Sequence, residues 1–208
     1  MMQLKPMPPA TLERLAIEGP AGALETDLND PGELRRGIAI VAHPNPVQGG
    51  TKDNKVVTTL AKTFFNLGYP VLRPNFRGVG ASAGTFDRGI GETEDLLAVI
   101  RYAQQRYGEL PLLLAGFSFG AFVQTRVSKV VEPSRLVLVG AAVNRFPAET
   151  VPEHTLVIHG EHDDVVPLSA VMDWARPQRL PVVVVPGGEH FFHGRLDLLS
   201  RILLDRLG

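Results

Sequence analysis

The sequence predicts a single α/β domain in which a mostly parallel sheet carries helices on both faces. Three observations lead to this fold class. Six short apolar runs recur along the 208 residues, and each is nearly unbroken, as expected of strands buried on both sides. Amphipathic segments with the period of a helix lie between these runs, and repeated strand–helix units build a parallel sheet. A hairpin-like segment comes first, which brings the expected number of strands to eight.

The elements are expected in the following order. Residues 14–28 read RLAIEGPAGALETDL, two strand-like stretches joined by a Gly-Pro-Ala-Gly turn, and predict an antiparallel hairpin. The six apolar runs predict strands at 37–43, 69–76, 110–117, 135–142, 154–160 and 180–187. The amphipathic segments predict helices at 54–68, 93–108, 120–131, 168–177 and 194–208. Gly68 and Gly108 are suited to end the first two helices. No linker or repeat interrupts this pattern, so one domain is expected over 1–208.

The composition argues against several classes of protein. A net charge of −1 gives no basis for electrostatic binding to nucleic acid or to an acidic membrane. The chain has no cysteine, which excludes disulfides, thiolate metal sites and a cysteine nucleophile. Residues 1–15 lack the apolar core of a secretory signal, and no 18-residue apolar stretch occurs. We therefore expect a soluble, cytoplasmic protein.

Two serines lie in a Gly-x-Ser-x-Gly pattern, Ser82 and Ser118. This pattern marks a reactive serine when it forms a sharp turn from a strand into a helix, because the turn brings the two glycines close together. An apolar strand precedes Ser118 and an uninterrupted helical segment follows it. The segment after Ser82 is rich in glycine and cannot begin a helix at once, which favours a structural loop. Ser118 is the candidate nucleophile, with a small residue at a tight turn as the alternative.

A serine nucleophile needs a base and a carboxylate that orients the base. Both are expected on loops after later strands, at the edge where the carboxyl ends of parallel strands meet. The loop after strand 154–160 supplies Glu161, Asp163 and Asp164, and the loop after strand 180–187 supplies His190 and His193. Residue types and order alone leave the choice among them open.

Five segments carry a resemblance to a known family. They are, in chain order, AHPNPVQGGTKDNKVV, NFRGVGASAGTFDRGIGETED, GFSFGA, HGEHDDVVP and GGEHFFHG. Over about residues 12–207 the chain resembles the α/β-hydrolases, specifically the small bacterial branch without a lid that includes dienelactone hydrolases and esterases. The family pattern G-x-x-D-x-V-V-P aligns its acid with Asp163, and the family's catalytic histidine aligns with His190. The resemblance thus implies an α/β-hydrolase fold and a catalytic triad of Ser118, His190 and Asp163.

The sequence offers three alternatives to this assignment. Asp164 could be the acid, although the family pattern sets Asp163 at that position. His193 could be the base, but it lies where the last helix is expected to begin and could simply cap or pack there. A metal site on Asp163 would draw on His154, His159 and His162. No third ligand has convincing spacing for it, so we expect neither a metal nor a cofactor.

Acyl transfer also needs N–H donors for the developing oxyanion. One is expected from the backbone of Phe119, the residue after the nucleophile. The other is expected from the loop after strand 37–43, which reads His-Pro-Asn-Pro. Because proline has no N–H, only His43 and Asn45 can donate there, and the family position favours Asn45. A rigid turn without a chemical role is the alternative. Arg77 is expected to brace the loop that contains Ser82.

The connection 143–153 is too short for a lid domain, so we expect an open site. Phe119, Phe191 and Phe192 are the candidate apolar walls around the substrate. The function expected is that of a serine hydrolase that cleaves carboxylic esters of small or accessible acyl groups through an acyl-enzyme. A peptidase or amide hydrolase with the same triad is one alternative, and a non-catalytic binding scaffold on this fold is another.

Overall fold

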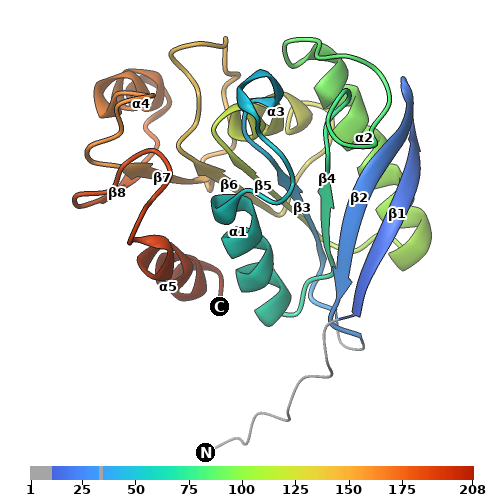
Figure 1. Ribbon diagram of the computed structural model, residues 1–208. Coiled ribbons are helices and arrows are strands. Elements are labelled where there is room, and N and C mark those ends of the chain that lie inside the picture. The colour runs from blue at the N-terminus through green and yellow to red at the C-terminus, as the bar shows by residue number, and fades with distance from the viewer. Residues whose placement is uncertain (1–10, 33–34) are drawn as a thin grey trace, which may run out of the picture.

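The computed structural model describes residues 11–32 and 35–208, which form an eight-stranded sheet with helices on both faces (Figure 1). The strand order is β1-β2-β4-β3-β5-β6-β7-β8. The strands are β1 (Thr11–Gly19), β2 (Gly22–Asp30), β3 (Ile38–Ala42), β4 (Val71–Pro74), β5 (Leu112–Phe117), β6 (Arg135–Val139), β7 (Leu156–Gly160) and β8 (Val182–Val185). The predicted fold class is therefore confirmed. The first ten residues of the segment examined for a secretory signal lie outside the described residues.

The sheet is parallel from β4 to β8 and antiparallel at the hairpin. β1 pairs with β2 from Thr11 opposite Asp30 to Gly19 opposite Gly22, and β2 runs antiparallel to β4. Every residue of β3 and β5 is buried, which explains why these runs are apolar without alternation. Chain order reverses around β3, since β4 lies on one side of it and β5 on the other. Sites in open α/β sheets form at such a reversal, beyond the carboxyl ends of the strands.

Two layers of helices cover the sheet. The helices are α1 (Lys55–Asn66), α2 (Ile90–Tyr107), α3 (Phe119–Val127), α4 (Leu168–Ala175) and α5 (Leu196–Leu207). α1 and α5 lie against one face, while α2 and α3 lie against the other (Figure 1). Successive strand residues point to opposite faces, so Ile40 of β3 packs with α2 and α3, and Val41 packs with α1 and α5. In the described part of the chain, no helix is long and apolar enough to span a bilayer.

The start of α2 differs from the sequence prediction. The helix begins at Ile90 instead of residue 93. The carboxylate of Glu92 accepts hydrogen bonds from the backbone N–H groups of Asp87, at 2.8 Å, and Gly89, at 2.7 Å. These bonds satisfy donors that would otherwise lack partners at the helix start. The capping group is therefore a glutamate inside the first turn.

The end of α3 was also predicted wrongly. The helix ends at Val127 rather than at residue 131. After Ser128, whose N–H still bonds to Gln124, the N–H groups of Lys129 and Val130 bond three residues back, to the carbonyls of Arg126 and Val127. These tighter turns close the helix one turn early.

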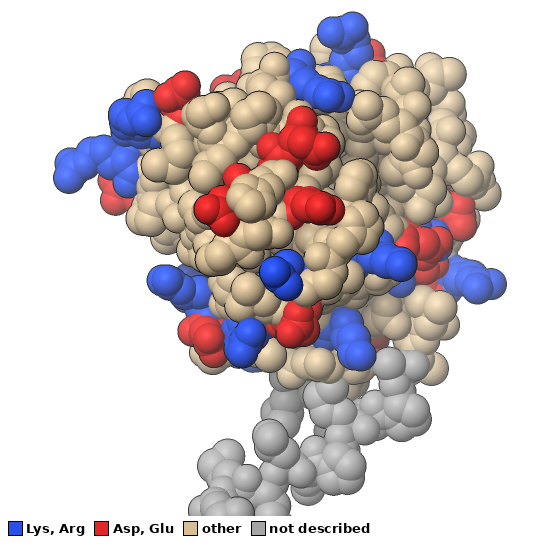
Figure 2. Space-filling view, turned by 60° about the vertical axis from the view of Figure 1, so that its left-hand side comes forward, with Lys and Arg blue, Asp and Glu red and all other residues tan. Residues whose placement is uncertain are grey.

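Charges of both signs share the surface. Figure 2 shows acidic side chains gathered near the middle of one face, with basic side chains mostly around them. This face carries no extended basic stripe of the kind that nucleic-acid-binding proteins present. The expectation that the chain does not bind nucleic acid stays a prediction.

A buried ion pair braces the loop between β4 and α2. Arg77 donates from Nε and Nη2 to the two carboxylate oxygens of Asp95, at 3.0 and 2.7 Å. The backbone N–H of Arg77 donates to the same carboxylate at 3.2 Å. Both side chains are buried. The contacts agree with the loop-bracing role expected for Arg77.

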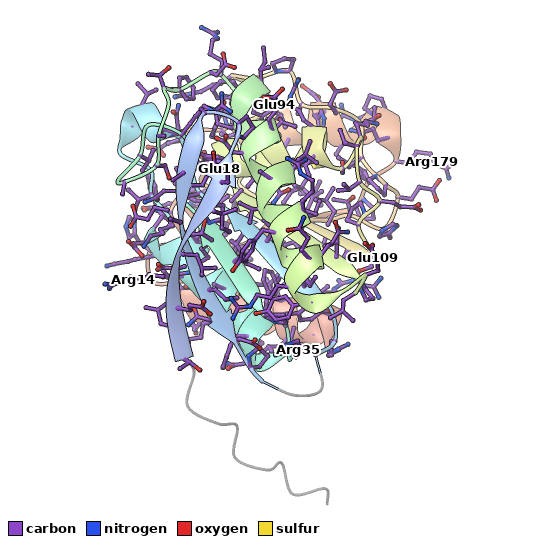
Figure 3. All side chains as sticks on the ribbon, turned by 90° about the vertical axis from the view of Figure 1, so that its right-hand side faces the viewer. Arg14, Glu18, Arg35, Glu94, Glu109 and Arg179 are labelled. Carbon is purple, nitrogen blue, oxygen red and sulfur yellow. The ribbon has the colours of Figure 1, made fainter. Side chains whose placement is uncertain are left out.

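Replacing Asp95 with alanine should lower the free energy of unfolding by about 3–5 kcal/mol, because Arg77 would stay buried without its counter-charge. Urea denaturation of the two proteins measures this difference. Glu94→Ala is the matched control, since Glu94 is exposed on the same helix (Figure 3) and its loss should change stability by less than about 0.5 kcal/mol. Equal losses in the two variants would contradict the account.

Candidate active site

Ser118 forms the whole connection between β5 and α3. The strand ends at Phe117 and the helix begins at Phe119. Ser118 itself has φ 55° and ψ −115°, a conformation that costs a residue with a side chain about 1–3 kcal/mol. A strained strand-to-helix turn of this kind presents its serine at the carboxyl edge of the sheet.

Close packing explains the two glycines around Ser118. A Cβ on Gly116 would lie 2.4 Å from the backbone of Gly120. A Cβ on Gly120 would lie 2.4 Å from the carbonyl oxygen of Ala42 in β3. No side chain fits at either position without moving the backbone. The pattern therefore follows from the approach of α3 to the central strands.

The second serine pattern has a structural role, as predicted. Ser82 Oγ donates to the carbonyl oxygen of Asn75 at 2.8 Å and accepts from the N–H of Glu25 at 2.9 Å. Its flanking residues Gly80 and Gly84 have φ values of 56° and 84°. The loop does not enter a helix directly after Ser82, and its hydroxyl is fully used in holding β2 against the end of β4.

The structure brings Ser118, His190 and Asp163 together in a hydrogen-bonded row. His190 Nε2 lies 3.0 Å from Ser118 Oγ, and His190 Nδ1 lies 2.7 Å from Asp163 Oδ2. Each of the three residues is at most 7% exposed. When Nδ1–H donates to the carboxylate, Nε2 is left free to accept the serine proton. The geometry predicted from the sequence for these three side chains is present.

The surroundings of Asp163 keep its carboxyl group charged. Its Oδ1 accepts from the N–H groups of Val165, at 3.0 Å, and Val166, at 2.7 Å. Burial opposes ionisation, but the hydrogen bonds from His190 and Val166 outweigh it and hold the pKa of Asp163 below its ordinary value. Asp163 is therefore a carboxylate at neutral pH and can stabilise a positive charge on His190.

The other candidate acid and the other candidate base lie outside this hydrogen-bonded row. Asp164 is exposed. His193 is exposed as well, and its Nδ1 lies 3.5 Å from Glu189. His154 precedes the amino end of β7, whereas Asp163 follows its carboxyl end. Among the described residues, no group of three or more His, Asp and Glu side chains is arranged to hold a metal ion.

His159 supports Asp163 from behind, a contact that sequence reasoning missed. Its Nε2 lies 2.8 Å from the carbonyl oxygen of Val166 and 3.4 Å from Asp163 Oδ2. Because a carbonyl oxygen only accepts, Nε2 carries the hydrogen. Burial lowers the pKa of His159, so the ring is neutral. The only sequence signal was its place four residues before Asp163, at the end of β7.

The backbone N–H groups at the two positions predicted to bind an oxyanion, Phe119 and Asn45, differ in their surroundings, and their role as donors stays a prediction. Phe119 is the first residue of α3, so its N–H has no partner inside the helix. Asn45 lines the same cavity as Ser118. Its side chain accepts from Val47 and its carbonyl accepts from Gly50, which fixes the loop. The N–H of Asn45 has no acceptor within the described ranges.

His43 fastens this loop to the end of β4. Its Nδ1 lies 2.7 Å from the carbonyl oxygen of Pro44, and its Nε2 accepts from the N–H of Phe76 at 2.9 Å. The N–H of Phe76 only donates, so the hydrogen of His43 is on Nδ1. Burial lowers the pKa of His43 to about 4, against the opposing effect of the hydrogen bond to Pro44. The ring is neutral at neutral pH and acts as a fixed link.

Of the three phenylalanines predicted to line the cavity, only Phe191 does so. Phe191 is 43% exposed and lines the cavity. Phe119 is fully buried among other aromatic rings, including those of Phe76 and Phe122, and Phe192 is fully buried in the core beneath α1 and α5. The substrate-binding role predicted for Phe192 is therefore wrong. Its φ of 53° turns the side chain into the core, where a phenylalanine is stabilised by burial.

A cavity of about 320 Å³ lies beside the hydrogen-bonded row. It is lined by Pro44, Asn45, Gln48, Gly49, Gly50, Asn54, Ser118, Arg145, Val165, His190 and Phe191. This volume is at the lower end of the range for small-molecule sites. Sequence reasoning missed Gln48, Asn54, Arg145 and Val165, because their loops carry no pattern that shows which side chains turn inward.

A serine on a strand-to-helix elbow, bonded to a histidine and an aspartate above a mostly parallel sheet, defines the class of α/β serine hydrolases, and this chain is one of them. Residues 46–153, more than half of the chain, match the family described as serine aminopeptidase, S33. The chain belongs to this family. The matched range contains Ser118 but ends before Asp163 and His190.

Solved structures agree with this class. An α/β serine hydrolase homologue from Coxiella burnetii is 40% identical, with a TM-score of 0.87 over 94% of this chain and 97% of that one. A serine hydrolase without a lid from Xanthomonas campestris is 38% identical, with a TM-score of 0.89 over 98% and 96%. In sequence alone, the chain is also similar to an uncharacterised protein of Rickettsia prowazekii, with 29% identity over 94% of this chain and 89% of that protein.

The depressed pKa of His43 predicts how stability depends on pH. The unfolded chain binds a proton near pH 6.5 and the folded chain near pH 4, so the unfolded state is favoured as the pH falls through this window. The contribution of the neutral His43 ring to the free energy of unfolding should be fully present above pH 6.5. It should be lost as the pH falls towards 4, by up to about 3 kcal/mol. Urea denaturation at several pH values measures this loss.

Other buried groups, including His159, titrate in the same direction, so the comparison is with His43→Gln and His43→Asn. These variants should lose less stability than the wild type between pH 6.5 and 4, because their side chains do not titrate. Parallel pH curves for wild type and variants would show that His43 does not contribute.

Proposed function

We propose that this protein is a carboxylesterase that works through an acyl-enzyme on Ser118. The observation that carries the proposal is the row in which His190 lies 3.0 Å from Ser118 Oγ and 2.7 Å from Asp163. A serine hydroxyl becomes a nucleophile when such a base takes its proton. We include a cytoplasmic location in the proposal, supported by the lack of cysteine in the chain.

The proposed reaction uses the chain's own groups and water. Ser118 Oγ attacks the ester carbonyl while His190 Nε2 takes its proton, and Asp163 stabilises the imidazolium. The N–H groups of Phe119 and Asn45 donate to the oxyanion of the tetrahedral intermediate. His190 then gives the proton to the departing alcohol. Water, deprotonated by His190, attacks the acyl-enzyme in the same way and releases the acid.

The cavity supports small or accessible acyl groups. Residues 140–155, which connect β6 to β7, form neither a helix nor a strand and therefore supply no lid. The volume of about 320 Å³ has room for roughly ten water-sized groups. A long acyl chain would extend beyond it into solvent.

Amide hydrolysis by the same residues is the second candidate, and membership of the S33 family favours it. An aminopeptidase must also bind the α-ammonium group of its substrate, for which a carboxylate is the natural partner. Within the described residues, the cavity lining contains no Asp or Glu and contains Arg145. This charge supports the esterase over the aminopeptidase.

Replacing Ser118 with alanine should lower kcat for 4-nitrophenyl butyrate by at least about 10⁴-fold, because the nucleophile is lost. Ser82→Ala is the matched control from the other Gly-x-Ser-x-Gly segment and should keep activity within a few-fold. A fluorophosphonate should label the wild type and Ser82→Ala but not Ser118→Ala. Activity in Ser118→Ala would overturn the proposal, and a folded wild type that takes no label would favour a binding scaffold.

The choice between ester and amide is open to direct comparison. We expect kcat/KM to be higher for 4-nitrophenyl butyrate than for alanine 4-nitroanilide. The ratio of the two values should well exceed the ratio of the rates at which hydroxide hydrolyses the two compounds without enzyme. The reason is that the cavity holds an acyl chain but no partner for an ammonium group. Preferential cleavage of the anilide, relative to that intrinsic difference, would establish the aminopeptidase instead.

A further inference from the structure

The cavity beside Ser118 carries positive charge without a matching negative one. Arg145 lines it, and apart from His190 the other lining residues are uncharged. Among the described residues, some arginines have a carboxylate within 4 Å, such as Arg77 with Asp95 at 2.7 Å and Arg106 with Glu13 at 2.6 Å, and others, such as Arg101 on the surface of α2, have none. In the residues that the structure describes, the guanidinium of Arg145 has no carboxylate within 4 Å. An anion entering the cavity would therefore find an available partner.

The backbone that presents Arg145 is held firmly. The N–H groups of Arg145 and Phe146 both donate to the carbonyl of Ala142, each at 3.2 Å. The ring of Phe146 stacks on Phe122 with centroids 4.9 Å apart, which anchors the loop to α3. Asn144 donates to the carbonyl of Val165 at 3.2 Å, across the cavity margin. The side chain thus starts from a fixed point on the loop between β6 and β7.

The rest of the lining suits a short carbon chain that ends in a polar group. Phe191, Val165 and Pro44 supply apolar surface, and the amides of Gln48 and Asn54 are neutral. A six-carbon acyl group with a terminal carboxylate has about the number of heavy atoms that the cavity can hold, given roughly 30 Å³ for each water-sized group. A guanidinium recognises a carboxylate through two parallel hydrogen bonds.

We infer that the substrate carries a carboxylate in addition to its ester group, and that Arg145 binds this carboxylate while Ser118 attacks the ester carbonyl. This inference rests on the proposed esterase function. It makes Arg145 a residue that determines specificity. Since Arg145 is exposed, its contribution should weaken with added salt.

Two pairs of esters test this preference, one for each side of the ester bond. The first compares the mono-4-nitrophenyl ester of adipic acid with 4-nitrophenyl hexanoate, which has the same six acyl carbons and no carboxylate. The second compares 4-carboxyphenyl butyrate with phenyl butyrate. The quantity measured is the ratio of kcat/KM for the charged ester to that for the neutral one.

In at least one pair, the ratio in the wild type should exceed that in Arg145→Gln by roughly tenfold, which corresponds to about 1.4 kcal/mol. Arg145→Lys should keep part of the preference, and Arg145→Glu should give a lower ratio than Arg145→Gln. Arg101→Gln, a change of an exposed arginine on α2, should leave the ratio unchanged. Raising the salt from 0.05 to 1 M should lower the wild-type ratio towards that of Arg145→Gln.

Equal ratios in the wild type and Arg145→Gln for both pairs would overturn the inference, as would a ratio that does not respond to salt. These results leave the proposed function intact if the neutral esters are still hydrolysed in a manner that requires Ser118. Hydrolysis that persists in Ser118→Ala would instead refute the esterase itself. The two failures are therefore distinguished by the neutral substrates.

Discussion

The close approach of α3 to the two central strands is the constraint on which the site depends. Glycine at 116 and 120 allows the helix to begin directly after β5, since a Cβ at either position would lie 2.4 Å from backbone atoms. This approach holds Ser118 at φ 55° and ψ −115°, and so raises its hydroxyl above the edge of the sheet. The base, the acid and the N–H donors are then placed around a hydroxyl whose position does not vary.

The sequence predicted the features that depend on order and hydrophobic pattern. Apolar runs located the strands, and parallel strands necessarily bring their carboxyl ends to one edge. The strand order alone therefore assigns the loops with Asp163 and His190 to the same edge of the sheet as Ser118. The choice over Asp164 and His193 came from the resemblance to a family. The structure places both alternatives outside the hydrogen-bonded row.

Side-chain direction within loops was not predictable. Phe191 and Phe192 are adjacent and chemically identical, yet one lines the cavity and the other is buried, because the backbone at Phe192 turns into a left-handed conformation. Arg145 lies in a loop that the sequence described by its length alone. His43 and His159 hold the site loops through backbone groups, the N–H of Phe76 and the carbonyl of Val166, and a hydrogen bond to the backbone requires no particular residue type at the other end. A sequence pattern has no means of recording such a contact.

The plain connection between β6 and β7 has a consequence for how turnover proceeds. In enzymes with a mobile cover, opening and closing often set the rate. Residues 140–155 form neither a helix nor a strand, so this connection supplies no such cover, and a ligand would not have to wait for it to open. Without closure of this segment around a ligand, the fixed lining of the cavity is left to discriminate between ligands. New preferences could evolve by exchanging one or two wall residues, without rebuilding a moving part.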